Sequence, residues 1–354
     1  MYIKGKHACT HVHAHTVELP YIVVPHACTS NAHCIVLGGR GRTTESFLIH
    51  NRMNKIIYRS GFISIVGPPN SGKSTLINRL VGKKISIVSQ KVQTTRFSIR
   101  GILNFEINPL EKSQLIFIDT PGLFKPKRNL DKLILNDAIK NIQDVDHSLI
   151  LYDVKSGRGL TQFLETLNFI KTNKLRSSLV LNKIDLIEKK KLFQIINQIL
   201  DHTKFIKVFM ISAKKGDGCK DLIDYLVKKV PIGNFLYSEN SETNLPNELL
   251  ASEITREKLF HNLGFEIPYN LFVKTINWIE KRGQVKIYQN IFVSKQNYKM
   301  IIIGKNGENI KKIGQNARLE LETIFKKKIH LFLFIKVKKN WVKESNNHKF
   351  FGFN

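Results

Sequence analysis

Cysteine is scarce in this sequence, which has four in 354 residues, at Cys9, Cys28, Cys34 and Cys219. They are too few and too scattered for a disulfide scaffold, and this usage indicates a reducing compartment. Uninterrupted apolar runs are short as well, and none reaches the roughly 18 residues that a membrane-spanning helix needs. Any membrane contact is therefore expected to be peripheral, and a chain of this length has room for two or three domains.

Acidic residues are few relative to basic ones, with 28 Asp and Glu against 56 Lys and Arg and a formal net charge of +28. Such an excess favours binding to polyanions, either nucleic acid or an anionic membrane surface, and carries no information about the fold. A biased genome rich in Lys, Ile and Asn would give a similar composition. Charge alone therefore does not separate the two explanations.

Residues 1–52 differ in character from the rest of the chain. The tetrapeptide His-Ala-Cys-Thr occurs twice, at 7–10 and 26–29, among alternating histidines. A metal site is one interpretation, but the C-x-x-C spacing of a zinc knuckle is missing. A transit peptide would be richer in Arg and Ser, and a secretory signal needs a longer apolar core. We expect residues 1–55 to be a disordered or mis-started extension, with Met53 as the functional start and no assigned function.

A glycine-rich loop lies between a predicted strand at 62–66 and a predicted helix at 75–80, and it reads G-P-P-N-S-G-K-S from Gly67 to Ser74. Strand, loop and helix in this order form a phosphate-binding element of the pattern G-x-x-x-x-G-K-[ST]. The backbone N–H groups and the helix N-terminus direct partial positive charge at phosphate oxygens. Lys73 is expected to reach the β- and γ-phosphates, and Ser74 to hold Mg²⁺. The alternative is a chance glycine loop.

Two further segments fit a γ-phosphate and metal site. A polar loop at 88–96 contains Thr94 and Thr95, either of which can place its hydroxyl on Mg²⁺ and its N–H on the γ-phosphate. A Thr pair alone is a weak signal, because most lie on solvated turns. A predicted strand at 114–118 ends in Asp119-Thr120-Pro121-Gly122, where the carboxylate suits the Mg²⁺ side and the Gly122 N–H can sense the γ-phosphate.

The next predicted strands, at 148–152, 178–181 and 208–211, complete a nucleotide site. The second ends in Asn182-Lys183-Ile184-Asp185, where the Asp185 carboxylate can accept hydrogen bonds from guanine N1–H and N2–H₂, a donor pair that adenine lacks. Lys183 can lie over the base, and Asn182 can tie this loop to the phosphate loop. The third ends in Ser212-Ala213-Lys214, whose backbone can meet guanine O6. Ligands of open α/β sheets bind at such strand ends, so the sequence predicts a GTPase.

One catalytic feature is missing from this pattern. Leu123 follows Gly122, where Ras-type enzymes have the Gln that orients the attacking water. Hydrolysis is therefore expected to be slow, to use another group, or to need a partner or cation. Asn70 is placed to add an oxygen ligand near the phosphates, and we hypothesise a K⁺ site there.

The second half predicts an RNA-binding module. Residues 231–246 have the composition of a linker, and a helix, two strands, a helix, Gly304-Lys305-Asn306-Gly307, a helix and a strand follow. A G-x-x-G loop between helices is how a KH module clamps RNA, although the tetrapeptide alone also fits a plain turn. Lys311 and Lys312 lie beside the loop, and residues 246–354 have 20 Lys and Arg against 9 Glu and no Asp. Sequence-specific RNA readout favours single strands, so the expected ligand is unpaired RNA.

With these motifs in place, residues 53–342 resemble the bacterial Era family of GTPases. The likeness includes the phosphate loop and Gln93-Thr94-Thr95-Arg96, and it extends through Ala251-Ser252-Glu253-Ile254 and Lys311-Lys312-Ile313-Gly314. The resemblance implies a GTP-gated factor that binds the 3′ end of small-subunit (16S) ribosomal RNA during assembly of the 30S subunit. It also implies a cytoplasmic protein, partly at the inner membrane face, and a hydrophobic residue in place of the catalytic Gln. Pro68 and Asn247-Glu248-Leu249 depart from the usual family pattern.

The expected fold is an α/β P-loop GTPase domain with a mixed, mostly parallel sheet, followed by a small α+β type II KH domain. We place the GTP-binding domain at 56–230, the linker at 231–246, the KH domain at 247–342 and a tail at 343–354, and expect a monomer. The alternatives are a GTPase of tRNA modification and a nucleotide-independent RNA-binding protein.

The expected site residues fall into four groups. The catalytic residues are Lys73, Thr95, Asp119 and Gly122, and the Mg²⁺ ligands are Ser74, Thr95 and Asp119. The GTP- or GDP-binding residues are Gly67, Asn70, Ser71, Gly72, Lys73, Ser74, Thr75, Asp119, Thr120, Pro121, Gly122, Asn182, Lys183, Asp185, Ser212, Ala213 and Lys214. The RNA-binding residues are Gly304, Lys305, Asn306, Gly307, Lys311 and Lys312.

Overall fold

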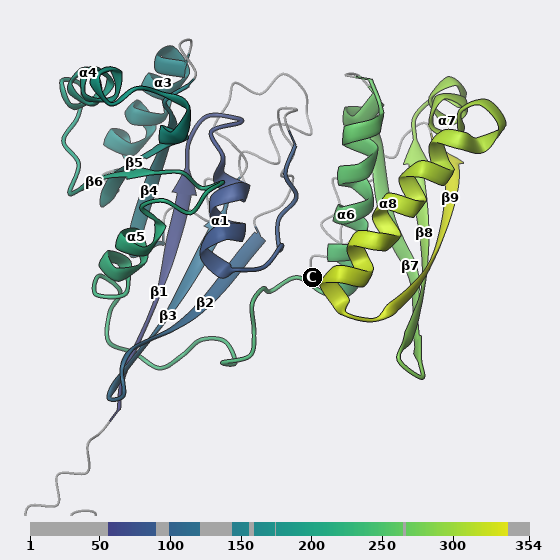
Figure 1. Ribbon diagram of the computed structural model, residues 1–354, viewed down its shortest axis with the longest axis horizontal. Coiled ribbons are helices and arrows are strands. Elements are labelled where there is room, and N and C mark those ends of the chain that lie inside the picture. The colour runs from purple at the N-terminus through teal and green to yellow at the C-terminus, as the bar shows by residue number, and fades with distance from the viewer. Residues whose placement is uncertain are drawn as a thin grey trace, which may run out of the picture. The chain divides into compact units, whose positions relative to one another are not determined.

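The computed structural model describes residues 56–89, 99–120, 144–155, 159–173, 175–264 and 267–338 (Figure 1). The predicted extension at 1–55 and the tail at 343–354 lie outside these residues. So do Thr94, Thr95, Pro121, Gly122 and Leu123. In the part of the chain that is described, no helix combines the length and the apolar character needed to cross a membrane.

The first domain is built on a six-stranded sheet with the strand order β2-β3-β1-β4-β5-β6. Only β2 runs antiparallel to its neighbour; the other pairs are parallel. Every residue of β5 is buried, as expected of a strand covered on both faces. The strands are β1 (Ile57–Val66), β2 (Ile99–Asn108), β3 (Glu111–Asp119), β4 (His147–Asp153), β5 (Ser177–Asn182) and β6 (Val208–Ile211). This confirms the predicted mixed, mostly parallel sheet.

Helices cover this sheet in two apolar clusters. One cluster joins residues of β1 and β3 to α1 (Lys73–Val81) and α5 (Cys219–Leu226). The other joins β4 and β5 to α3 (Gly159–Thr172) and α4 (Lys189–Leu200), with Tyr152 and Phe163 meeting edge to face. Because the sheet is sandwiched in this way, its polar loops are left at the strand ends.

Residues 231–246, expected to be a linker, are hydrogen-bonded to the edge of the first domain. The Ser60 amide donates to the Pro231 carbonyl (3.1 Å), and the Ile102 amide donates to the Glu242 carbonyl (2.9 Å). The Gln114 carboxamide oxygen accepts the amides of Leu236 and Tyr237, each at 2.9 Å. The segment therefore joins the two domains while its backbone is paired with β1 and β2 and anchored by the side chain of Gln114 in β3.

The second domain has helices on one face of a three-stranded sheet, β7-β8-β9. The β7–β8 pair is antiparallel and the β8–β9 pair is parallel. The elements are α6 (Asn247–Asn262), η2 (Ile267–Asn270), β7 (Leu271–Lys281), β8 (Gln284–Val293), α7 (Gln296–Ile303), η3 (Lys305–Gly307), α8 (Glu308–Phe325) and β9 (Lys328–Val337). Leu259, Val273, Ile291, Ile302 and Ile313 form its core. The predicted α+β order is confirmed.

Candidate functional site

The phosphate loop connects β1 to α1, and its conformation depends on Gly72. Gly72 caps the helix with φ 98°, and a Cβ there would lie 2.3 Å from the Asn182 amide nitrogen. Glycine is the residue that accepts both the left-handed conformation and the close approach. Ser71 beside it is buried, and its Oγ has no hydrogen-bond partner among the described residues. The loop thus offers a donor as well as a helix N-terminus to a bound phosphate.

Lys73 is buried at the base of this loop. Its Nζ donates to the carbonyls of Gly67 (3.1 Å) and Pro68 (2.8 Å). Burial lowers the pKa of Lys73 to about 8, although the nearby Asp119 carboxylate acts in the opposite direction. A partly desolvated ammonium beside carboxylate and carbonyl groups is suited to a phosphate, which stabilises the charged form.

The expected metal ligands Ser74 and Asp119 lie together. Ser74 Oγ donates to Asp119 Oδ2 at 2.8 Å, and Ser86 Oγ donates to the same oxygen at 2.6 Å. Hydroxyl and carboxylate oxygens are ligands that Mg²⁺ prefers, and this ion keeps water and substrate phosphates as its other ligands. The described residues include no group of three or more His, Cys, Asp or Glu side chains that could hold a metal. The residues present fit Mg²⁺ bound together with a nucleotide.

Asn182 connects three loops of the nucleotide site. Its Nδ2 donates to the Ser71 carbonyl (2.8 Å), and its Oδ1 accepts the amides of Lys183 (2.8 Å) and Ala213 (3.0 Å). The phosphate loop, the Asn182-Lys183-Ile184-Asp185 loop and the Ser212-Ala213-Lys214 loop are therefore held in one arrangement. Asp185 follows at the first turn of η1 (Ile184–Leu186) and is half-buried, which leaves its carboxylate accessible to a base.

Three residues of this region were not expected from the sequence. Arg79 of α1 donates from Nε to the Ala213 carbonyl (3.1 Å) and from Nη2 to the Lys214 carbonyl, which fixes the loop after β6. Asp153, at the end of β4, forms an ion pair with Lys183 Nζ at 2.5 Å. The third is Ser86. Asp153 could have been found from its position at a strand end, whereas Arg79 and Ser86 have no local motif.

Some of the predicted site residues make other contacts than expected, and others lie outside the described part of the chain. The Thr120 hydroxyl donates to the Ile65 carbonyl (2.7 Å), so this side chain joins β3 to β1. Thr75 is half-buried on α1. The expected roles of Thr95, Pro121 and Gly122 concern residues outside the described part of the chain, and they stay predictions.

A groove in the second domain lies between α8 and β9. It has a volume of about 570 Å³ and is lined by Ile310, Lys311, Gly314, Gln315, Arg318, Leu331 and Leu333. The lining residues of α8 recur at helical spacing, and Arg318 lies about two turns after Lys311. This spacing could have indicated Arg318 from the sequence. Lys312 is exposed and is not a lining residue. At the N-terminal end of α8, Gly307 has φ 78°, and a Cβ there would meet nothing within 4 Å, which leaves room for a backbone phosphate.

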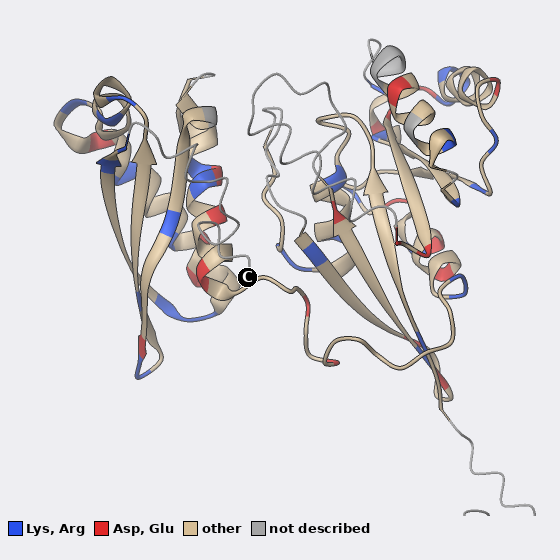
Figure 2. Ribbon diagram, turned by 180° about the vertical axis from the view of Figure 1, so that it is seen from behind, with Lys and Arg blue, Asp and Glu red and all other residues tan. Residues whose placement is uncertain are grey.

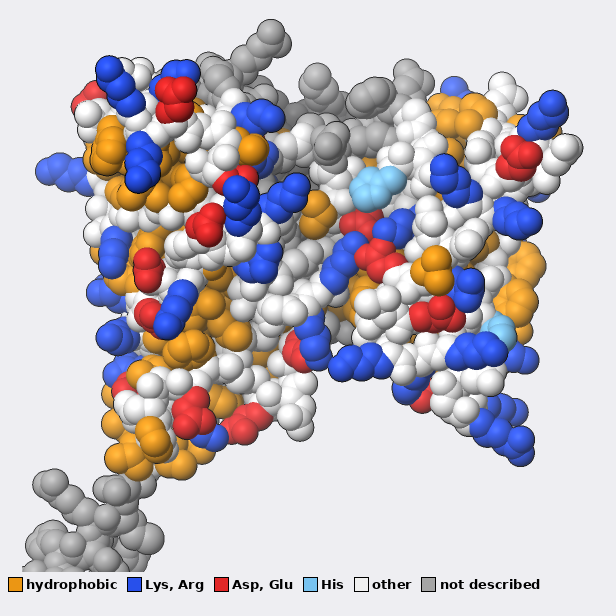
Figure 3. Space-filling model, viewed as in Figure 1, with side chains coloured by type: hydrophobic (Ala, Val, Ile, Leu, Met, Phe, Trp, Pro, Cys, Tyr) orange, Lys and Arg blue, Asp and Glu red, His pale blue; other side chains and the backbone are white. Residues whose placement is uncertain are grey.

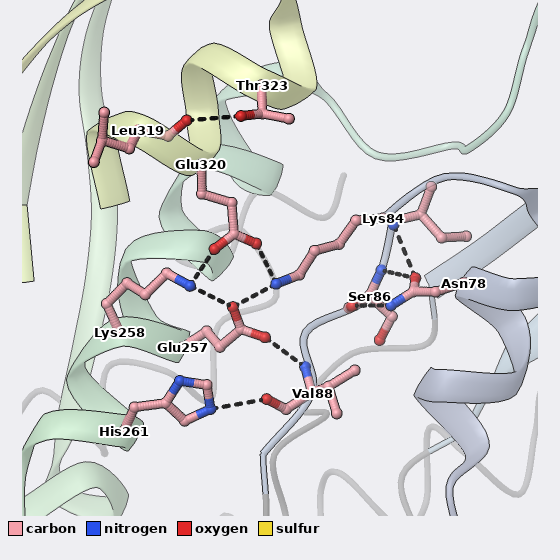
Figure 4. Close-up of polar contacts among 11 residues, drawn as sticks. Asn78, Lys84, Ser86, Val88, Glu257, Lys258, His261, Leu319, Glu320 and Thr323 are labelled. Atoms are coloured by element: carbon pink, nitrogen blue, oxygen red, sulfur yellow. Dashed lines mark hydrogen bonds and ion pairs between the residues drawn. The ribbon is translucent and has the colours of Figure 1, made fainter. Parts of the chain in front are cut away.

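The segment that leaves α1 connects the region around Asp119 in the first domain to the second domain (Figure 4). Asn78 holds it, because Oδ1 accepts the amides of Ile85 and Ser86 at 2.9 Å each. The Val88 amide then donates to Glu257 Oε1 of α6 (2.8 Å), and the Val88 carbonyl lies 3.1 Å from His261 Nε2. The same segment is thus bonded to Asp119 through Ser86 and to α6 through Val88.

Charged side chains reinforce this contact. Lys84 Nζ pairs with Glu257 Oε2 at 2.6 Å and also with Glu320 of α8, which in turn pairs with Lys258. Burial alone would raise the pKa of Glu320, but hydrogen bonds from Lys258 and Lys84 outweigh it and hold this pKa below its usual value. Burial would lower the pKa of Lys258, and its bonds to Glu320 and Glu257 leave that pKa raised. Glu320 and Lys258 therefore remain charged near neutral pH.

The sheet order, the phosphate loop and the Asn182-Lys183-Ile184-Asp185 loop define a P-loop GTPase domain, and the second domain is a KH domain. Residues 62–183 match the family model described as 50S ribosome-binding GTPase, and residues 266–342 match the KH domain model.

Curated relatives cover most of both domains. GTPase Era of Mesorhizobium japonicum is 42% identical over 83% of this chain and 93% of its own length, and GTPase Era of Agrobacterium fabrum is 45% identical over 81% and 89%. A crystal structure of an Aquifex aeolicus Era variant bound to GDP and AlF₄⁻ covers 83% of this chain and 99% of its own, with 35% identity and a TM-score of 0.77. A structure of Era with MgGDPNP and nucleotides 1506–1542 of 16S ribosomal RNA has 36% identity and a TM-score of 0.76. The chain belongs to the Era family of GTPases.

Proposed function

We propose that this protein is a GTP-gated ribosome-assembly factor that binds the unpaired 3′ end of 16S ribosomal RNA in the KH groove. The observation that carries the proposal is one chain of contacts: the segment held by Asp119 and Asn78 is also bonded to α6 of the KH domain. The related Era structure that contains both a GTP analogue and 16S RNA supports the choice of RNA. The RNA backbone would pass the Gly304–Gly307 loop and the groove beside Lys311 and Arg318.

Hydrolysis in the proposed mechanism depends on charge stabilisation. Lys73 offers its ammonium to the β- and γ-phosphates, and the loop N–H groups share the charge. Ser74 and Asp119 would hold Mg²⁺, which supplies a Lewis acid when bound. Thr95 and Gly122 are proposed to bind Mg²⁺ and the γ-phosphate, respectively, with Thr94 as the alternative to Thr95. Leu123 cannot orient water, so this family member needs another aid to hydrolysis.

Potassium is the proposed aid. Asn70 has φ 63° in the phosphate loop, and its carbonyl accepts Lys183 Nζ at 3.0 Å. The backbone is therefore fixed and the Asn70 side chain would supply an oxygen ligand. We expect K⁺ to stimulate GTP turnover and Asn70→Ala to remove that stimulation. Equal stimulation of the variant and the parent protein would show that Asn70 binds no K⁺.

Gating of RNA binding by the nucleotide follows from the same contacts. Mg²⁺ held together with the nucleotide would take Asp119 as a ligand, in competition with the hydrogen bond from Ser86. The position of residues 84–88 would therefore depend on what is bound. Val88 and Lys84 transmit that difference to Glu257 of α6, and a ligand shifts an equilibrium by its differential affinity for the two states.

A direct test is titration of the full chain with an unpaired RNA that carries the 16S 3′-terminal sequence. We expect tighter binding with a non-hydrolysable GTP analogue than with GDP, and preference for GTP over ATP in a separate nucleotide titration. Equal RNA affinity in both nucleotide states would contradict the gating. Tight RNA binding without any nucleotide preference would favour the alternative of a nucleotide-independent RNA-binding protein.

A GTPase of tRNA modification is less well supported, because the second domain matches a KH model rather than an RNA-modifying domain. Binding of tRNA in preference to the 16S sequence would reverse that choice. Membership of the Era family supports a cytoplasmic location. Association with the inner membrane and a monomeric state stay expectations.

A further inference from the structure

The two faces of the edge strand β9 carry different side chains. Successive residues of a strand point to opposite faces, and Leu331 and Leu333 line the groove beside α8. Phe332 and Phe334 therefore point to the other face of the sheet, away from the helices. Phe332 stacks on Tyr288 of β8, with ring centroids 4.7 Å apart and an interplanar angle of 14°, which places Tyr288 on the same outer face.

Apolar ring surface is exposed on this outer face. Phe332 is 41% exposed and Phe334 is 48% exposed. Figure 3 shows hydrophobic side chains at the right-hand margin of the molecule, where Figure 1 places β9. Exposed aromatic rings on a sheet are the platforms on which proteins stack unpaired bases.

Positive charge surrounds these rings without opposing carboxylates. Lys286 and Lys336 are exposed at outward positions of β8 and β9. The one carboxylate within the three described strands is Glu280, which faces the helix side opposite Val285 and pairs with Lys327. Figure 2 shows Lys and Arg positions along these strands, with an acidic position only near the β7–β8 hairpin. The charge complements a polyanion.

We infer that the outer face of the β7-β8-β9 sheet is a second binding surface for unpaired RNA, continuous with the groove around the edge of β9. Bases stack on Tyr288, Phe332 and Phe334, and Lys286 and Lys336 contact phosphates. This rests on the proposed function, because the strand that reaches the outer face is the one held in the groove. A single strand of RNA is flexible enough to pass from Leu333 on one side of β9 to Phe334 on the other.

The chain's own C-terminal segment is a weaker candidate occupant. Residues 339–354 contain aromatic residues, but Lys339, Lys343 and Lys349 outnumber Glu344. A basic segment on a basic face is repelled, whereas RNA neutralises the face and releases counterions.

The test compares two RNAs bound to the full chain: one of about six nucleotides that fills the groove, and one of about 16 that extends it at both ends. Phe332→Ala with Phe334→Ala should weaken binding of the longer RNA about tenfold or more and leave the shorter RNA unaffected. Phe193→Ala is the matched control, because Phe193 is 60% exposed on α4, in the other domain. For the longer RNA, the slope of log K against the logarithm of salt concentration should become less steep in Lys286→Gln with Lys336→Gln. The expected change is about 0.7 per lost phosphate contact.

Hydroxyl-radical footprinting supplies a measurement without variants. We expect the longer RNA, and not the shorter one, to protect Tyr288, Phe332 and Phe334 from oxidation. Protection already present in the free protein would overturn the inference in favour of the C-terminal segment. A membrane would be favoured, and the inference overturned, by two results together. The Phe332→Ala, Phe334→Ala variant would bind the longer RNA as tightly as the parent does, and only the parent would bind phosphatidylglycerol vesicles. If neither RNA binds, the proposed function itself fails.

Discussion

At the scale of single residues, the nucleotide site depends on a few side chains with several partners each. Asn182 joins three loops through three hydrogen bonds, and Asp119 accepts bonds from both Ser74 and Ser86. Such groups were predictable because each follows a strand in a short motif. Arg79 and Ser86 were not predictable, because their partners lie 134 and 33 residues away in the chain.

The buried Lys73 predicts that nucleotide binding is coupled to proton uptake. Burial lowers its pKa to about 8 in the free protein, and a bound phosphate favours the charged form. Nucleotide binding at pH 8 should therefore take up roughly half a proton, and affinity for GTP should fall as the pH rises from 7 to 9. Calorimetric titration in buffers with different ionisation enthalpies measures the uptake. An uptake of zero at pH 8 would show that Lys73 is fully charged before the nucleotide arrives.

At the scale of secondary-structure elements, the strands were easier to predict than the helices between them. Buried parallel strands read as apolar runs followed by a motif, and the predicted runs at 62–66, 114–118, 148–152, 178–181 and 208–211 lie within observed strands. α4 and α5 were not expected, because no motif accompanies them. The 231–246 segment has linker composition, yet its backbone pairs with β1 and β2. Composition gives no information on such long-range backbone pairing.

The β4–β5 pair contains a histidine that sets a limit on stability in acid. His147 is 4% exposed, and its Nε2 lies 2.9 Å from Ser178 Oγ. Burial, with smaller effects from Lys229 and Arg176, lowers the pKa of His147 from 6.5 to about 4. The native state thus binds fewer protons than the unfolded state between these values, and stability is lost as the pH falls through 6.5 toward 4.

Between pH 7.5 and pH 5 this histidine should cost about 2 kcal/mol of unfolding free energy. Urea unfolding of His147→Phe at both pH values should show a smaller loss than the parent protein. His202→Gln, which changes an exposed histidine, is the control and should behave like the parent. If the unfolding free energy falls by the same amount between the two pH values in the parent and in His147→Phe, His147 is not the group that titrates.

The loop between α7 and α8 gives a prediction for RNA. Lys305→Asp with Asn306→Asp places negative charge where RNA phosphates would pass, so RNA affinity should fall at least tenfold while the melting temperature stays unchanged. Lys190→Asp with Asn197→Asp on α4 makes the same change in charge at exposed positions of the other domain. If both double variants bind RNA equally well, the loop does not contact the RNA.

At the scale of the whole molecule, the two domains are in contact through residues that no sequence pattern marks. Lys84 pairs with Glu257 and Glu320 across 173 and 236 residues of chain. The domain types followed from local motifs, but this contact depends on tertiary structure. Because Glu257 is 1% exposed, its charge needs these partners.

In the proposed function, the nucleotide state sets the RNA affinity through residues 84–88 and α6. The most direct measurement is the ratio of RNA dissociation constants with GDP and with a GTP analogue, in the parent protein and in Lys84→Met and Glu257→Gln. Lys83→Met is the matched control, since Lys83 pairs with Glu242, which lies in the 231–246 segment and not in α6. We predict a ratio well above one for the parent and Lys83→Met, and a ratio near one for the other two. A ratio near one in the parent, or an unchanged ratio in Lys84→Met and Glu257→Gln, would contradict the account.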